Sequence, residues 1–99
     1  MVDPAQTPYR TSPVFDEESL PTAFRREHAT KAGVWGVIRL IEGRLRLSLL
    51  DSGREELLTP SRAGLILPAQ PHIVTPKGPM KMCVEFYDRP PQFAPGEIA

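Results

Sequence analysis

The placement of proline constrains this chain more than any other feature of its sequence. Twelve of its 99 residues are proline, more than double the usual share of about 5%. None of them lies inside the apolar runs 34–41, 45–50 and 80–87. Because proline has no backbone N–H and is confined to turns and strand edges, this spacing predicts short β-strands separated by turns.

The clearest predicted element is a β-hairpin in the first half of the chain. Residues 34–50 alternate apolar and polar side chains, and Glu42-Gly43 fits a two-residue turn. In that register Arg39 faces Arg46, and the two guanidinium groups repel unless an anion or a carboxylate lies between them. One face of the hairpin is apolar and is predicted to be buried; it consists of Ile38, Leu40, Leu45, Leu47 and Leu49.

Further short strands are expected at 11–15, 55–59, 63–67, 73–75 and 80–87. Seven or eight strands at this spacing predict an all-β barrel or sandwich of one domain over residues 11–88. Residues 1–10 and 89–99 are polar and proline-rich and are predicted to form a flexible N-terminal arm and a flexible C-terminal tail.

Two segments leave alternatives open. Residues 20–28 fit either a short helix with Pro21 in its first turn or an extended segment. The face of the last strand formed by Met80, Met82, Val84 and Phe86 is predicted to be core, or a dimer interface if one chain covers it only partly.

Composition excludes several classes of protein. Twelve Lys and Arg balance twelve Asp and Glu, so the charge does not favour a nucleic-acid or membrane partner. Cys83 is the only cysteine, which favours a reducing compartment. The N-terminus lacks a signal-peptide pattern, and no apolar run approaches the roughly 20 residues that span a bilayer. We therefore expect a soluble, cytoplasmic protein.

The two histidines form the candidate site. His72 stands at the start of a predicted strand, after the strand 63–67 and the turn at Pro68, and His28 precedes the strand at 34–41. Two imidazoles inside one barrel predict a site for a divalent metal (Zn, Fe, Ni or Mn). Glu85 is the best third ligand by residue type, with Cys83 two residues away. Alternatively, both histidines are hydrogen-bonded side chains that line a polar cavity.

Other side chains extend this hypothesis. Trp35 and Tyr87 are predicted to line the same cavity and to stack on a ligand or cofactor, or else to be core residues. Arg39 and Arg46 fit a clamp for an oxyanion, or else a solvated face near Glu55 or Glu56. No nucleophile triad is visible, so catalytic residues stay unassigned.

The chain also resembles a known family. Gly43, Gly64, Pro68 and His72 are similar to the two motifs of cupins, which are small double-sheet β-barrels. More narrowly, the chain resembles the tellurite-resistance cupins, such as the N-terminal domain of TehB and YeaR-like proteins. That resemblance covers about residues 11–88, at Leu20-Pro21, at the H-x-T-K-x-G-x-W-G run from His28 to Gly36, and at Gly43, His72 and Phe86-Tyr87.

The resemblance implies a cupin-like double-stranded β-helix, or jelly-roll barrel, that forms a homodimer. It implies a stand-alone domain that binds a metal or a small-molecule or oxyanion ligand in its lumen, in tellurite or chemical-stress resistance. In longer members the cupin precedes a methyltransferase domain that uses S-adenosylmethionine. This chain has no Gly-rich strand-to-helix loop, so we expect no S-adenosylmethionine site. A metal-free regulatory or interaction module and a metal-dependent enzyme such as a dioxygenase are the alternatives.

Overall fold

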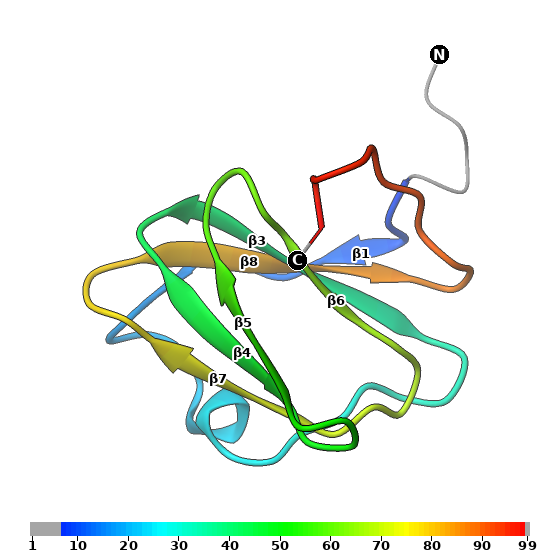
Figure 1. The fold of residues 1–99 in the computed structure, drawn as a ribbon, viewed down its shortest axis with the longest axis horizontal. Coiled ribbons are helices and arrows are strands. Elements are labelled where there is room, and N and C mark those ends of the chain that lie inside the picture. The colour runs from blue at the N-terminus through cyan, green and yellow to red at the C-terminus, as the bar shows by residue number, and fades with distance from the viewer. Residues whose placement is uncertain (1–6, 99) are drawn as a thin grey trace.

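The computed structural model describes residues 7–98, which form two antiparallel β-sheets with almost no helix (Figure 1). One sheet has five strands in the order β1-β8-β3-β6, with β2 also paired to β8, and the other has three in the order β5-β4-β7. The all-β prediction is confirmed as a two-sheet sandwich. The strands are β1 (Arg10–Thr11), β2 (Phe15–Asp16), β3 (Trp35–Glu42), β4 (Leu45–Leu49), β5 (Arg54–Leu58), β6 (Gly64–Ile66), β7 (His72–Pro76) and β8 (Lys81–Tyr87).

The main hydrophobic core fills the space between the two sheets. Every residue of the predicted apolar face at 38–49 is buried in it, and so are three of the four predicted core residues of the last strand, with Phe86 packed against them. Both face assignments are confirmed. The core consists of Leu20, Ile38, Leu40, Leu45, Leu47, Leu49, Leu58, Ile66, Val74, Met80, Met82 and Val84.

The predicted pairing of residues 34–41 with residues 44–50 is wrong. β3 pairs with β6 and β8, whereas β4 pairs with β5 and β7. The turn at Gly43 therefore carries the chain from one sheet to the other instead of closing a hairpin. Gly43 has a φ of +80°, and a Cβ there would lie 2.3 Å from the Pro79 carbonyl oxygen and 2.7 Å from the Met80 Cα. Only glycine fits such a close approach of two corners.

Six of the strands form three bent units, each made of two consecutive strands and called an arm here, and the three arms lie side by side. The central arm is β3–β4; β5–β6 runs along one side of it and β7–β8 along the other. Each arm places one strand in each sheet, so each contributes to both walls of the core (Figure 1).

The ambiguous segment 20–28 contains a 3₁₀ helix, η2 (Thr22–Arg25). Pro21 precedes it, and the Phe24 N–H donates to the Pro21 carbonyl at 3.0 Å. Leu20 is buried in the main core, and Phe24 packs against it. Nowhere in residues 7–98 is there a helix with the length and apolar character needed to cross a membrane.

The two ends of the described chain contact the five-stranded sheet. Residues 1–6 of the predicted arm and residue 99 of the predicted tail lie outside the described residues. β1 pairs with β8, and the Ala63 N–H donates to the Glu97 carbonyl at 2.8 Å. Phe93 and Ile98 pack on a second, smaller cluster of Val37, Ala63 and Tyr87. The segment predicted as a flexible C-terminal tail thus covers part of the outer face of this sheet.

The corner at Gly43 gives a test of the arm geometry. Gly43→Ala and Gly53→Ala both place a side chain at positive φ, +80° and +73°, but only position 43 lacks room for a Cβ. We expect Gly53→Ala to cost about 1–2 kcal/mol of unfolding free energy, and Gly43→Ala to cost roughly 1–3 kcal/mol more because of overpacking. Urea unfolding measures both, and equal losses would contradict the close approach of the two corners.

Candidate functional site

The structure brings His28 and His72 together. Their backbones form an isolated antiparallel bridge, in which the His28 N–H donates to the His72 carbonyl at 2.9 Å and the His72 N–H donates to the His28 carbonyl at 2.8 Å. The two imidazole rings meet edge to face, with centroids 5.3 Å apart. The Phe24 ring also packs on the His28 ring, with centroids 5.2 Å apart.

His72 is the buried member of the pair, with 1% of its surface exposed. Its Nδ1 lies 2.9 Å from the Gln70 carbonyl oxygen. Since a carbonyl only accepts, Nδ1 carries the proton and Nε2 keeps a lone pair. Burial lowers the pKa of His72, the hydrogen bond to Gln70 acts in the opposite direction, and the proximity of His28 lowers the pKa further. His72 is therefore neutral at pH 7.

The turn before His72 is held by side chains on both sides. The Gln70 amide accepts from the Leu67 N–H at 2.9 Å and donates to the Asp51 carboxylate at 3.1 Å. Thr30 fastens the other side, because its hydroxyl donates to the Leu67 carbonyl and accepts from the Ala69 N–H, each at 3.2 Å. The motif at His28–Gly36 is thereby attached to the turn that orients His72.

Glu85, the predicted third metal ligand, lies on the other side of the five-stranded sheet. It pairs in register with Val37 of the outer cluster, and its Oε1 accepts from Arg39 Nε and from the Tyr87 hydroxyl, each at 3.0 Å. Among residues 7–98, no group of three or more His, Cys, Asp or Glu side chains is placed to hold a metal. These residues do not fit a three-ligand metal centre, and metal binding by the two imidazoles stays a prediction.

Trp35 and Tyr87, the predicted ligand-stacking pair, are cross-strand neighbours on this same outer face. Tyr87 is 4% exposed, and Trp35 packs against the cluster that contains it. Burial raises the pKa of Tyr87, and the hydrogen bond to Glu85 raises it further. Burial also raises the pKa of the nearby Cys83 thiol. A pocket opens next to His28, and neither aromatic ring lines it.

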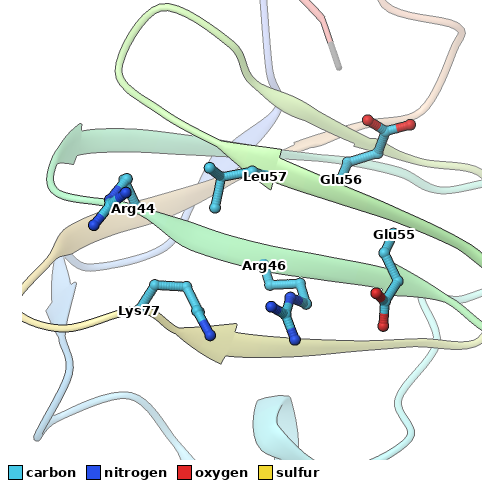
Figure 2. Close-up of a pocket in the computed structure, with 6 residues that line it drawn as sticks. All are labelled: Arg44, Arg46, Glu55, Glu56, Leu57 and Lys77. Carbon is cyan, nitrogen blue, oxygen red and sulfur yellow. The ribbon is translucent and has the colours of Figure 1, made fainter.

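The predicted clamp of Arg39 and Arg46 is wrong, because β3 and β4 belong to different sheets. Arg39 donates to Glu85 and, through Nη1, to Glu97 at 3.2 Å, and it lies over the Phe93 ring at 5.7 Å. It therefore holds the C-terminal segment on the sheet. Arg46 lies on the outer face of the three-stranded sheet (Figure 2).

A pocket of about 250 Å³ opens next to His28. Its walls come from the N-terminal segment, the His28 motif and β8, and the Arg10 guanidinium lies over the Phe86 ring at 5.8 Å. Arg10, His28 and Lys31 are basic, and none of the lining residues is acidic. The full lining is Tyr9, Arg10, His28, Ala29, Thr30, Lys31, Val34 and Phe86.

Sequence reasoning missed Arg10 and Lys31 as site residues. Lys31 could have been identified from the sequence, since it belongs to the H-x-T-K stretch that contains His28. No sequence pattern identifies Arg10, because it reaches the pocket only through the pairing of β1 with β8 at the far end of the chain.

Comparison with known proteins settles the family. A family profile described as "TehB-like domain" matches residues 10–84. This chain belongs to the TehB-like domain family. It is 34% identical over 56 residues to a protein of Haemophilus influenzae (strain Rd) named probable S-adenosyl-L-methionine-dependent methyltransferase TehB, a match that covers 52% of this chain and 20% of that protein. The protein of the same name in strain 10810 is 32% identical over 56 residues.

Solved structures agree on the fold. The crystal structure of TehB from H. influenzae superposes with a TM-score of 0.72 and 29% identity, covering 81% of this chain and 30% of that chain. A crystal structure of an E. coli (strain K12) protein gives a TM-score of 0.79 at 13% identity, over 91% of this chain and 97% of that one, which supports the fold alone. The chain spans about a fifth of the length of the curated relatives it matches, 20% in each case.

The buried imidazole predicts a pH dependence of stability. The unfolded chain takes up a proton on His72 near the ordinary pKa of 6.5, whereas the folded chain resists protonation to lower pH. Stability should therefore fall as the pH drops below about 6.5, by at most roughly 1.4 kcal/mol per pH unit, until the folded pKa is passed.

Urea midpoints between about pH 7 and pH 5 measure this slope. His72→Leu should remove it, whatever that substitution does to stability at pH 7. The matched variant His28→Leu keeps His72 and should retain most of the slope. If the pH dependence of stability persists in His72→Leu, it arises from another titrating group.

Proposed function

We propose that this TehB-like domain binds a small oxyanion in the pocket next to His28. The observation that carries this proposal is the set of Arg10, His28 and Lys31 around a space of about 250 Å³ with no acidic lining residue. In a chain with equal numbers of acidic and basic residues, such a one-sided lining concentrates positive potential locally and attracts anions.

The pocket walls are fixed before any ligand arrives. The bridge to His72 fastens His28 to β7, and the Thr30 hydroxyl is already engaged with Leu67 and Ala69. Arg10 is held by the pairing of β1 with β8 and by its contact with Phe86. A prearranged pocket loses little entropy on binding, which favours affinity.

The lining residues supply complementary chemistry. An arginine offers a planar fork of donors that matches an oxyanion, and a lysine offers a compact charge. His28 adds a ring N–H, and Tyr9 belongs to the same lining. The space is smaller than the 300–1,000 Å³ typical of drug-sized ligands, so tellurite or a similarly small oxyanion or carboxylate is the expected class.

The family supports the proposed link between this pocket and tellurite resistance. Three bent arms, each with one strand in each sheet, support a cupin-type jelly roll. The TehB-like profile covers most of the chain. In this proposal the domain captures the oxyanion through Arg10 and Lys31. Methyl transfer, which the name of the H. influenzae relative describes, would belong to a separate catalytic domain.

Calorimetric titration of the protein with sodium tellurite at low ionic strength tests the proposal. Arg10→Gln/Lys31→Gln should weaken binding by about a hundredfold or more, because each of the two lost charged hydrogen bonds is worth roughly 1.5–3 kcal/mol. Sulfate and selenite serve as competing oxyanions.

The control for this titration is Arg62→Gln/Lys81→Gln. It removes the same charge from two exposed residues that do not line the pocket and should bind tellurite like the parent chain. Equal weakening in both variants would mean that only net charge matters, and would refute a defined site.

A further inference from the structure

A second basic surface lies on the outer face of the three-stranded sheet. A groove of about 400 Å³ there is lined by Arg44, Arg46, Glu55, Glu56, Leu57 and Lys77 (Figure 2). Arg44 immediately precedes β4 and Arg46 lies within it, and both line the groove. The Lys77 N–H donates to the Arg44 carbonyl at 3.1 Å, which brings the third cation next to them.

These three cations have no acidic partner among the described residues. The ion pairs found in residues 7–98 involve Arg39, Arg54, Lys81 and Arg89 instead. The cross-strand neighbours of Arg46 are Leu57 and Thr75, neither of which is acidic. Like charges on neighbouring strands repel one another, so an anionic partner placed here would relieve the repulsion.

The rest of the lining indicates which anion fits. Leu57 is 44% exposed in the middle of the groove and offers an apolar contact. Glu56 already pairs with Arg54, whereas Glu55 stands on the outer face at the end of the groove without a paired cation among the described residues. Figure 2 shows Glu55 and Glu56 leaving β5 on opposite sides. A free carboxylate at one end repels a continuous polyanion such as nucleic acid.

We propose that this groove docks an acidic peptide segment of a partner protein. Carboxylates of the segment would pair with Arg44, Arg46 and Lys77, and an apolar side chain between them would cover Leu57. The surface shares no lining residue with the pocket next to His28, so the inference goes beyond the proposed oxyanion site and does not depend on it.

Fluorescence anisotropy with a short labelled peptide that alternates glutamate and leucine tests the proposal at low ionic strength. Arg46→Gln/Lys77→Gln should weaken binding about tenfold, which is within the range expected for two lost surface ion pairs. The matched variant Arg26→Gln/Arg62→Gln carries the same charge change on two exposed residues that line neither this groove nor the pocket next to His28, and it should bind within about twofold of the parent chain. Added salt should weaken the complex.

A gain-of-binding variant keeps the test independent of folding defects. Glu55→Gln removes the acid at the end of the groove and should tighten peptide binding by about twofold. Three results would overturn the inference. They are absence of peptide binding at low salt, equal weakening by the two double variants, and tighter binding of a single-stranded oligonucleotide through Arg46 and Lys77 than of the peptide.

Discussion

The corner at Gly43 is the constraint on which the arrangement of this domain depends. There the central arm leaves the five-stranded sheet as β3 and enters the three-stranded sheet as β4, and the backbone of Pro79 and Met80 packs directly against the turn. Because the two neighbouring arms must follow the same bend, each of them also divides between the sheets. The core is consequently enclosed by strands from all three arms, although consecutive strands often lie in different sheets.

The sequence predicted the faces of the strands but not their partners. The alternation of apolar and polar residues along a strand indicates which side chains point inward. In a two-sheet sandwich, β3 and β4 both direct their apolar side chains into one interior, whether or not they pair. Ile38 and Leu47 were therefore assigned correctly, while the facing of Arg39 and Arg46 was not. Pairing depends on the approach of Gly43 to Pro79, a contact between distant segments that no local pattern encodes.

The same reasoning explains why Glu85 does not lie with the histidines. A core made of Met80, Met82 and Val84 places every other residue of β8, including Glu85, on the outer face. His72 shares its face of β7 with the buried Val74. The alternation of side chains along β7 and β8 thus already argues against a site that contains both His72 and Glu85. The sequence alone is enough to predict this. Arg10 could not be found in that way, since its position depends on a long-range strand pair.

The acidic residues of the chain are distributed unevenly. Glu85 and Glu97 both hold Arg39, and this cluster attaches the C-terminal segment to the outer face of the five-stranded sheet. Five of the cations without an acidic partner among the described residues lie in two separate places, Arg10 and Lys31 next to His28 and Arg44, Arg46 and Lys77 on the outer face of the three-stranded sheet. A chain of zero formal net charge can therefore have two local concentrations of positive charge, because its acidic and basic residues are not evenly mixed.

The hydrogen bonds between His28 and His72 run through main-chain atoms only. Any amino acid other than proline can supply the N–H and C=O groups that this link requires. Exchanging the imidazole at position 28 would therefore alter what the neighbouring space recognises without detaching the loop from β7. Specificity at this wall can diverge during evolution while the scaffold behind it stays the same.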